Sequence, residues 1–204
     1  MRRNIIIADN FYDNPDEIRN VAINLEYPEQ NKDNTYPGRN SSKTYYTKEA
    51  HQKIQNLIGK KINYVPSSAC GDFRISYEED TCKQYIHVDG DYDWGGVIFL
   101  NPPEQCIVDA GTSFYRHKSL RTEKAPTNSK DGAIFGYTNY QEVRKSMIYE
   151  DGFDKSKWDC YLTTPMVYNR IVLFRPWLWH SHSKNFGDNI YNCRLVQLLF
   201  YKNE

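Results

Sequence analysis

The sequence predicts a mainly β protein, a sandwich or barrel of short strands with two N-terminal α-helices packed on its outside. From residue 70 onward, short segments rich in β-branched and aromatic residues alternate with turn residues, a texture typical of all-β architectures. Residues 1–69 instead carry the start and stop signals of helices. Aromatic residues make up 15% of the 204-residue chain, which argues against disorder because disordered chains are poor in them.

Local patterns place two helices and six strands. The run from Asn14 to Glu17 is typical of a helix start, because Pro15 fits the first turn and acidic side chains suit the helix dipole. A second helix is expected from Thr47 to Ile58, with Thr47 as its cap and Gly59 at its end. The expected strands are Ile5–Ile7, Phe73–Tyr77, Gly96–Leu100, Thr112–Tyr115, Tyr168–Phe174 and Arg194–Tyr201.

We expect one domain over residues 1–204, because no repeat, low-complexity segment or linker-like run divides the chain. Residues 1–69 would form a helical N-terminal support, and residues 70–201 the β core. A long polar stretch, 116–158, interrupts this core and carries one expected helix around Tyr140 to Met147. Loops of that length are usually functional, so the stretch is a candidate lid or substrate-selecting insert.

Charge and cysteine content exclude several classes of protein. The chain has 26 Lys+Arg and 26 Asp+Glu, so its zero net charge gives no reason to expect general nucleic-acid or membrane binding. No apolar run reaches the length of a membrane span, and the first ten residues lack the features of a secretion signal. Five cysteines without a CxxC pair form neither a disulfide framework nor a zinc ribbon. We therefore expect a cytoplasmic protein of open oligomeric state.

The strongest chemical signal is the pair His87 and Asp89. In an extended segment alternate side chains point the same way, so these two would share one face while Val88 points away. Such a pair is half of a metal site. An imidazole bonded to a nearby carboxylate is also a common structural pair, so the motif indicates a metal site only together with a third ligand.

That third ligand is offered near the other end of the chain by His180 or His182, which share strand parity and cannot be separated by alternation alone. Two imidazoles and one carboxylate form the facial triad of non-heme iron(II) oxygenases, which leaves coordination positions open. Further on, Arg194 enters an apolar strand, where an arginine is costly unless it meets an anion. Its planar fork suits a carboxylate.

The order His87-x-Asp89, a gap of roughly ninety residues, His180 and then Arg194 resembles the Fe(II)/2-oxoglutarate-dependent dioxygenases. Within that superfamily the chain is similar to prolyl-hydroxylase-like members of bacterial or phage type. The resemblance implies that His87, Asp89 and His180 bind Fe(II) and that Arg194 holds the distal carboxylate of 2-oxoglutarate. It also implies that O₂ and 2-oxoglutarate are consumed while a C–H bond is hydroxylated and succinate and CO₂ are released.

The same resemblance implies the fold. The family core is a double-stranded β-helix, a jelly-roll or cupin-like barrel, with the His-x-Asp motif near the second strand, the distal histidine on the seventh and the arginine on the eighth. Gly95–Asn101 and Gly111–Arg116 are similar to the two strands that follow the iron motif. The resemblance covers roughly residues 70–201 and, more loosely, the N-terminal helices, which look like those that precede the barrel.

Two positions depart from the family pattern or stay ambiguous. We take His180 rather than His182 as the ligand, because the family commonly shows a small residue after the distal histidine; His182 would then line the pocket. Many members carry Ser or Thr two residues after the arginine, whereas this chain has Val196. We expect Tyr77 or Tyr85 to supply the missing hydroxyl, with a packing role as the alternative for each.

The leading hypothesis is an oxygenase, and family analogy favours a peptide or protein side chain over a small molecule as its substrate. Nucleic acid is not favoured, because no basic stripe interleaved with aromatics is present. Two other hypotheses stay open: a zinc-dependent hydrolase on the same His/Asp/His site, and a catalytically silent jelly-roll binding module. Arg194 argues against the hydrolase, and the intact ligand set argues against the silent module.

Overall fold

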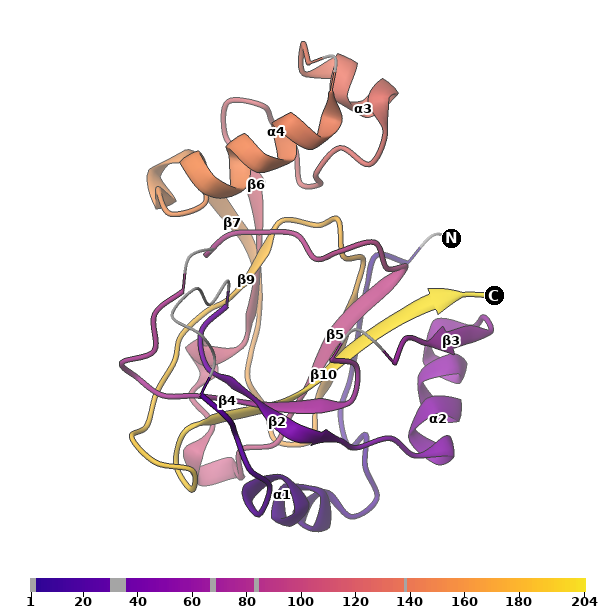
Figure 1. Ribbon diagram of the computed structural model, residues 1–204, viewed down its shortest axis with the longest axis vertical. Coiled ribbons are helices and arrows are strands. Elements are labelled where there is room, and N and C mark those ends of the chain that lie inside the picture. Colours follow the sequence, from indigo (N-terminus) through magenta and orange to yellow (C-terminus); the bar gives the residue numbers. More distant parts are fainter. Residues whose placement is uncertain (1–2, 30–35, 67–68, 83–84, 138) are drawn as a thin grey trace.

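Two antiparallel β-sheets form the body of the protein, as the computed structural model shows (Figure 1). The structure describes residues 3–29, 36–66, 69–82, 85–137 and 139–204. The larger sheet contains β1 (Ile5–Ala8), β2 (Arg39–Thr44), β3 (Ile62–Tyr64), β4 (Asp72–Ser76), β5 (Trp94–Phe99), β8 (Ile171–Phe174) and β10 (Arg194–Asn203). Its order is β1-β8-β5-β10-β4-β2, with β3 paired to β10. The smaller sheet has the order β7-β6-β9, formed by β6 (Thr112–His117), β7 (Trp158–Thr164) and β9 (His180–His182).

The helices belong to the N-terminal part and to the insert. They are α1 (Pro15–Ile23), α2 (Lys48–Ile58), α3 (Ser129–Ile134) and α4 (Tyr140–Ser146), which continues into a π-helical turn, Met147–Asp151. Short 3₁₀ turns occupy Pro103–Gln105, Val108–Ala110 and Lys155–Lys157. The fold is therefore strand-rich but mixed α/β, not mainly β. Among the described residues, strand pairing does not close the two sheets into a barrel.

The predicted ends of α2 are confirmed. The Thr47 hydroxyl oxygen accepts a hydrogen bond from the Ala50 N–H at 3.1 Å, which satisfies one of the donors that a helix start leaves free. Gly59 ends the helix with φ 74°, a left-handed conformation that glycine adopts without steric cost. At α1 the proline and the acidic first turn are present, but Asn14 makes no side-chain capping bond.

The N-terminal region, expected as a helical support with one strand, contains two further strands. The region 1–69 contributes β1, which the Ile5–Ile7 pattern predicts, but also β2 and β3 to the larger sheet. β2 is polar along its length and lies at the end of the sheet. Edge strands often carry polar and charged residues because these discourage pairing with other chains, and such a strand shows no apolar alternation to detect.

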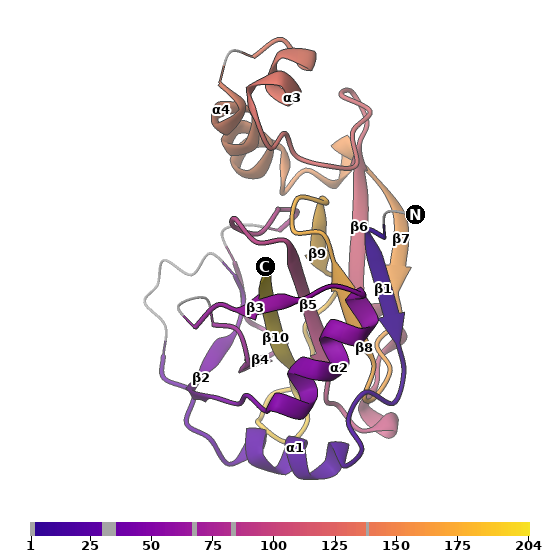
Figure 2. The ribbon, with the colours of Figure 1, turned by 90° about the vertical axis from the view of Figure 1, so that its right-hand side faces the viewer.

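Both faces of the larger sheet are buried, one beneath helices and one toward the smaller sheet. Helices α1 and α2 cover the outer face (Figure 2), where Ile18 and Ile54 join Phe73, Ile75 and Leu195 in one apolar cluster. A second cluster, with members from both sheets, lies on the inner face. Its members include Phe99, Phe114, Val172, Phe174, Val196 and Leu198. Side chains alternate between the two faces along β4 and β10, which decides what can enter the space between the sheets.

The insert between β6 and β7 stands above the smaller sheet and carries α3 and α4 (Figure 1). A third apolar cluster attaches it to the body, with Val143 and Met147 of the insert packed against Ile86 and Val88. The N–H of Ile86 also donates to the Gly152 carbonyl oxygen at 3.1 Å. The insert therefore packs behind the segment that carries His87. No helix of the described residues is long and apolar enough to cross a membrane.

Substituting Asp151→Ala should loosen the insert without unfolding the sheets. The Asp151 carboxylate lies 2.9 Å from Nε2 of buried His117 and also bonds Lys157. Losing it leaves a buried donor without a partner, which costs about 1–3 kcal/mol. Urea unfolding should report that loss, and hydrogen exchange should accelerate over residues 118–157.

The matched control is Asp154→Ala in the same loop, because Asp154 is exposed and its carboxylate bonds Ser156 alone among the described residues. This variant should have a smaller effect. Equal acceleration of exchange in β5 and β10 would contradict a local role for Asp151 in the insert.

Candidate metal centre

The two histidines meet through a backbone bridge between distant parts of the chain. His87 pairs with His180 of β9 in an antiparallel bridge: the His87 N–H donates to the His180 carbonyl oxygen at 3.0 Å, and the reverse bond measures 2.9 Å. Side chains directly opposite each other in such a pair share one face. Their ring centroids are accordingly 4.6 Å apart.

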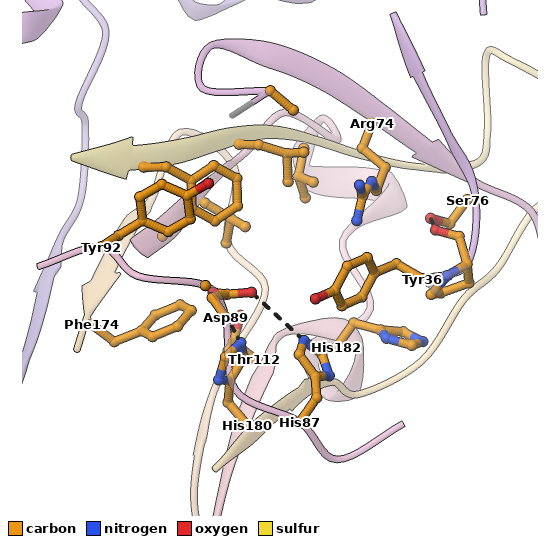
Figure 3. A pocket seen from close by; sticks show the side chains of 18 of the residues that line it. Tyr36, Arg74, Ser76, His87, Asp89, Tyr92, Thr112, Phe174, His180 and His182 are labelled. Atoms are coloured by element: carbon orange, nitrogen blue, oxygen red, sulfur yellow. Dashed lines mark hydrogen bonds and ion pairs between the residues drawn. The ribbon is translucent and has the colours of Figure 1, made fainter. Parts of the chain in front are cut away.

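Asp89 completes a group of three. Its Oδ1 lies 3.9 Å from Nε2 of His87, and its Oδ2 lies 3.4 Å from Nε2 of His180 (Figure 3). The three side chains are between 6% and 12% exposed. One ligand atom from each lies within 4.8 Å of the others, so the group could hold a metal ion.

Backbone carbonyls orient both imidazoles. Nδ1–H of His87 donates to the Tyr85 carbonyl oxygen at 2.9 Å, and Nδ1–H of His180 donates to the Leu178 carbonyl oxygen at 2.8 Å. A carbonyl oxygen can only accept, so each Nδ1 carries a proton and Nε2 is the ring nitrogen that faces Asp89. Histidines that bind a metal through one ring nitrogen usually donate the N–H of the other to such a carbonyl or to a carboxylate. The donor set, two imidazoles and a carboxylate, suits a divalent transition metal.

The protonation states also favour metal binding. Burial lowers the pKa of His87 to about 4, and the neighbouring His180 acts in the same direction against the opposing effect of Asp89. Burial alone would raise the pKa of Asp89, but His180, His87 and Arg74 outweigh it and hold that pKa below its usual value. At neutral pH His87 is therefore neutral and Asp89 is ionised, so neither loses a proton when a metal binds.

The carboxylate of Asp89 has room because β5 carries glycine beside it. A Cβ atom at Gly95 would lie 3.1 Å from Oδ2 of Asp89 and 3.7 Å from the Phe174 ring. The Phe174 ring in turn packs on His180 with centroids 4.5 Å apart. The glycine and the phenylalanine thus shape the space that the carboxylate and the imidazole occupy.

The three side chains lie at one wall of a cavity of about 280 Å³ between the sheets. Arg194 reaches the same cavity from β10 and is 4% exposed. Its Nε–H donates to the Ala110 carbonyl oxygen at 3.1 Å, and no carboxylate of the described residues pairs with it. Burial and the nearby Arg74 lower the pKa of Arg194 to about 10, which leaves the guanidinium charged at neutral pH.

Comparison with known proteins places the chain in a family. A family model matches residues 1–195. The chain belongs to DUF6445, a family of unknown function. No curated protein matches it. The matched residues include His87, Asp89, His180 and Arg194. The description of the family gives neither a metal nor a reaction.

The other predicted site residues lie apart from the three ligands. His182 faces the cavity beside Thr112, its partner across β6, and is not one of the group of three. Tyr77 packs against the outer cluster under the guanidinium of Arg39, since alternation after Ser76 turns it away from the cavity. Tyr85 donates its hydroxyl to the Ser183 carbonyl oxygen at 3.3 Å. Neither tyrosine lines the cavity.

Among the other residues that line the cavity are Tyr36, Arg74 and Thr112, which the sequence does not single out as site residues. Arg74 lies between Phe73 and Ile75 in a strand, so the argument applied to Arg194 could have found it. Tyr36 packs on His87 with ring centroids 4.8 Å apart, but it comes from a segment without any periodic pattern. No signal in the sequence points to Tyr36.

Gly95→Ala should weaken metal binding while the fold persists, because the added Cβ presses on the Asp89 carboxylate. We expect a loss of about 10-fold or more, the size typical of changes in groups that orient metal ligands. Titration calorimetry with Mn(II) or Zn(II), paired with thermal unfolding, measures both properties.

Gly96→Ala is the matched comparison. A Cβ at Gly96 would lie 2.3 Å from the Val172 carbonyl oxygen, so this variant should lose stability instead. If both variants lose affinity only in proportion to their unfolding, the local effect of Gly95 is contradicted.

The metal-free protein should lose stability as pH falls below about 6.5. Burial holds the pKa of His87 at about 4 and that of His182 at about 3, whereas the unfolded imidazoles titrate near 6.5. Between these values the unfolded chain binds more protons, so the free energy of unfolding falls by up to about 1.4 kcal/mol per pH unit for each histidine. Urea unfolding with a chelator present tests this, and His182→Gln should reduce the slope by about one proton. An unchanged slope would show that His182 is already protonated in the folded chain.

Proposed function

We propose that the protein is an Fe(II)- and 2-oxoglutarate-dependent oxygenase that hydroxylates a C–H bond and releases succinate and CO₂. The observation that carries this proposal is one cavity that holds both the His87, Asp89 and His180 group and the guanidinium of Arg194, which no carboxylate of the described residues pairs with. The ligand group suits the metal, and the guanidinium suits a dicarboxylate cosubstrate. A cytoplasmic location is part of the same proposal.

The order of the strands supports the jelly-roll part of the proposal. Eight elements follow one another along the chain: β4, the segment 85–89, and then β5 to β10. The larger sheet contains the first, third, sixth and eighth, and the smaller sheet contains the fourth, fifth and seventh. The His87–His180 bridge adds the second element beside the seventh. This alternation between two facing sheets matches a double-stranded β-helix, with the ligands on the second and seventh elements and the arginine on the eighth.

Each residue then has a physical role. When bound, iron and 2-oxoglutarate supply the oxidising chemistry, in which decarboxylation of the cosubstrate is coupled to hydroxylation. His87, Asp89 and His180 would hold the metal from one side and leave its cavity side open. Arg194 would grip the distal carboxylate through its fork. The apolar inner walls would limit the access of water to the reacting groups.

The alternatives fit the cavity less well. A zinc-dependent hydrolase could use the same three ligands, but it has no evident need for a buried guanidinium that no carboxylate of the described residues pairs with. A silent binding module has no need for two imidazoles whose Nδ1 atoms are both held by carbonyls. A peptide or protein side chain, or a small molecule, would reach the metal through the remaining cavity.

The direct test is binding of Fe(II) and 2-oxoglutarate under argon, followed by the weak visible charge-transfer band of the chelate. Arg194→Ala should weaken cosubstrate binding by about 30-fold or more, since losing one partner of a buried charged pair costs about 2 kcal/mol or more. Asp89→Ala should abolish succinate formation in air.

Arg39→Gln is the control, because Arg39 lies over the Tyr77 ring outside the cavity. This variant should keep the band. No band in the native protein, together with tight Zn(II) binding, would overturn the oxygenase and favour the hydrolase.

A further inference from the structure

A second guanidinium points into the same cavity from β4. Nε–H of Arg74 donates to Oδ1 of Asn40 at 2.7 Å, and the guanidinium lies 5.4 Å from the centroid of the Tyr36 ring. Its two terminal amino groups make no hydrogen bond to any described residue. In Figure 3 they face the open middle of the cavity, across from Asp89 and His180.

The two arginines lie close to each other without a shared counterion. In the pairing of β10 with β4, Arg194 stands opposite Ser76 and Val196 stands opposite Arg74, so the two guanidinium side chains belong to neighbouring pairs on the same face. Like charges repel strongly where water is scarce. Among the described residues the acid that lines this cavity is Asp89, and as a metal ligand it would already be engaged.

The charges of the loaded site do not balance. A divalent metal, the Asp89 carboxylate, the Arg194 guanidinium and the dianion of 2-oxoglutarate sum to zero when the imidazoles are neutral. The charge of Arg74, a half-buried residue, then remains without compensation in the cavity. Such a charge is costly unless an anion arrives with the next ligand.

The wall between Arg74 and the metal ligands is apolar. Val196, Leu198 and Phe200 of β10 line it, together with Val97 of β5. A phosphate would need several donors around it, and among the described residues the terminal amino groups of Arg74 are the free charged donors on this side. One planar fork beside an apolar wall suits a carboxylate carried on an apolar body.

We propose, on the basis of the proposed oxygenase function, that Arg74 binds a carboxylate of the primary substrate. The substrate is then an organic acid whose apolar body lies along Val196 and Leu198 and brings a C–H bond toward the metal. The carboxylate belongs either to a free acid or to an acidic residue of a peptide. Tyr36 holds the other side of the guanidinium by its ring.

The test uses protein loaded with Fe(II) and saturating 2-oxoglutarate under argon, so that Arg194 is already occupied. Hexanoate and hexanamide, which differ in charge but little in shape, are titrated by calorimetry. Native protein should bind hexanoate at least 10-fold more tightly than hexanamide. Arg74→Gln should lose this preference and keep the charge-transfer band, whereas Arg39→Gln should retain both. Arg74→Lys, which keeps the charge without the fork, should retain part of the preference.

A blocked tripeptide with a central glutamate, compared with its glutamine counterpart, separates the two sources of the carboxylate. Preference for either acid over its amide supports the proposal. Equal binding of acid and amide in native protein that shows the band overturns it. A loss of the band in Arg74→Gln as large as in Arg194→Ala also overturns it, because Arg74 would then hold the cosubstrate. An absent band in native protein counts against the oxygenase alone, and the hexanoate comparison on metal-loaded protein then decides Arg74 separately.

Discussion

The pairing of His87 with His180 is the constraint on which the site depends. Two backbone hydrogen bonds, at 3.0 and 2.9 Å, join the segment 85–89 to the short strand β9, and this segment pairs with no other strand of the described residues. Because opposite residues share a face, this single bridge places both imidazoles on the cavity side and sends Ile86 and Val88 into the cluster behind it. A slip of one residue in that register would bury the ligands in the apolar cluster and turn Val88 toward the cavity.

Along the strands of the larger sheet, side chains alternate between the outer apolar cluster and the cavity. Along β10, Leu195 and Leu199 face the outer cluster beneath the helices, while Arg194 and Val196 face the cavity. β4 repeats the pattern, with Phe73 and Ile75 outside and Arg74 and Ser76 inside. The outer residues bury apolar area and stabilise the sheet. The inner residues can therefore be charged, because the fold does not rely on their packing alone.

Much of this arrangement is readable from the sequence, and the exceptions have physical causes. Strand parity pairs His87 with Asp89, and the cost of a buried charge marks Arg194, because both act on neighbouring residues. His180 and His182 share parity, so only the family resemblance favours His180. Tyr77 lies outside the cavity, because alternation after Ser76 turns its side chain to the opposite face of the sheet. The polar edge strand β2 has no apolar period, so local pattern cannot reveal it. Tyr36 reaches His87 only through tertiary folding.

The insert affects the site only indirectly. None of its described residues between 118 and 157 lines the cavity. The insert forms hydrogen bonds with the backbone on both sides of His87. The Ile86 N–H donates to the Gly152 carbonyl oxygen, and a terminal N–H of Arg144 donates to the Asp89 carbonyl oxygen at 3.2 Å. A Cβ at Gly152 would lie 2.7 Å from the Ile86 carbonyl oxygen, so a larger residue at Gly152 would press on this segment. The geometry of the ligands is thus coupled to the packing of α4 and the turn after it. A change in the insert can alter the metal site without any insert side chain touching the metal.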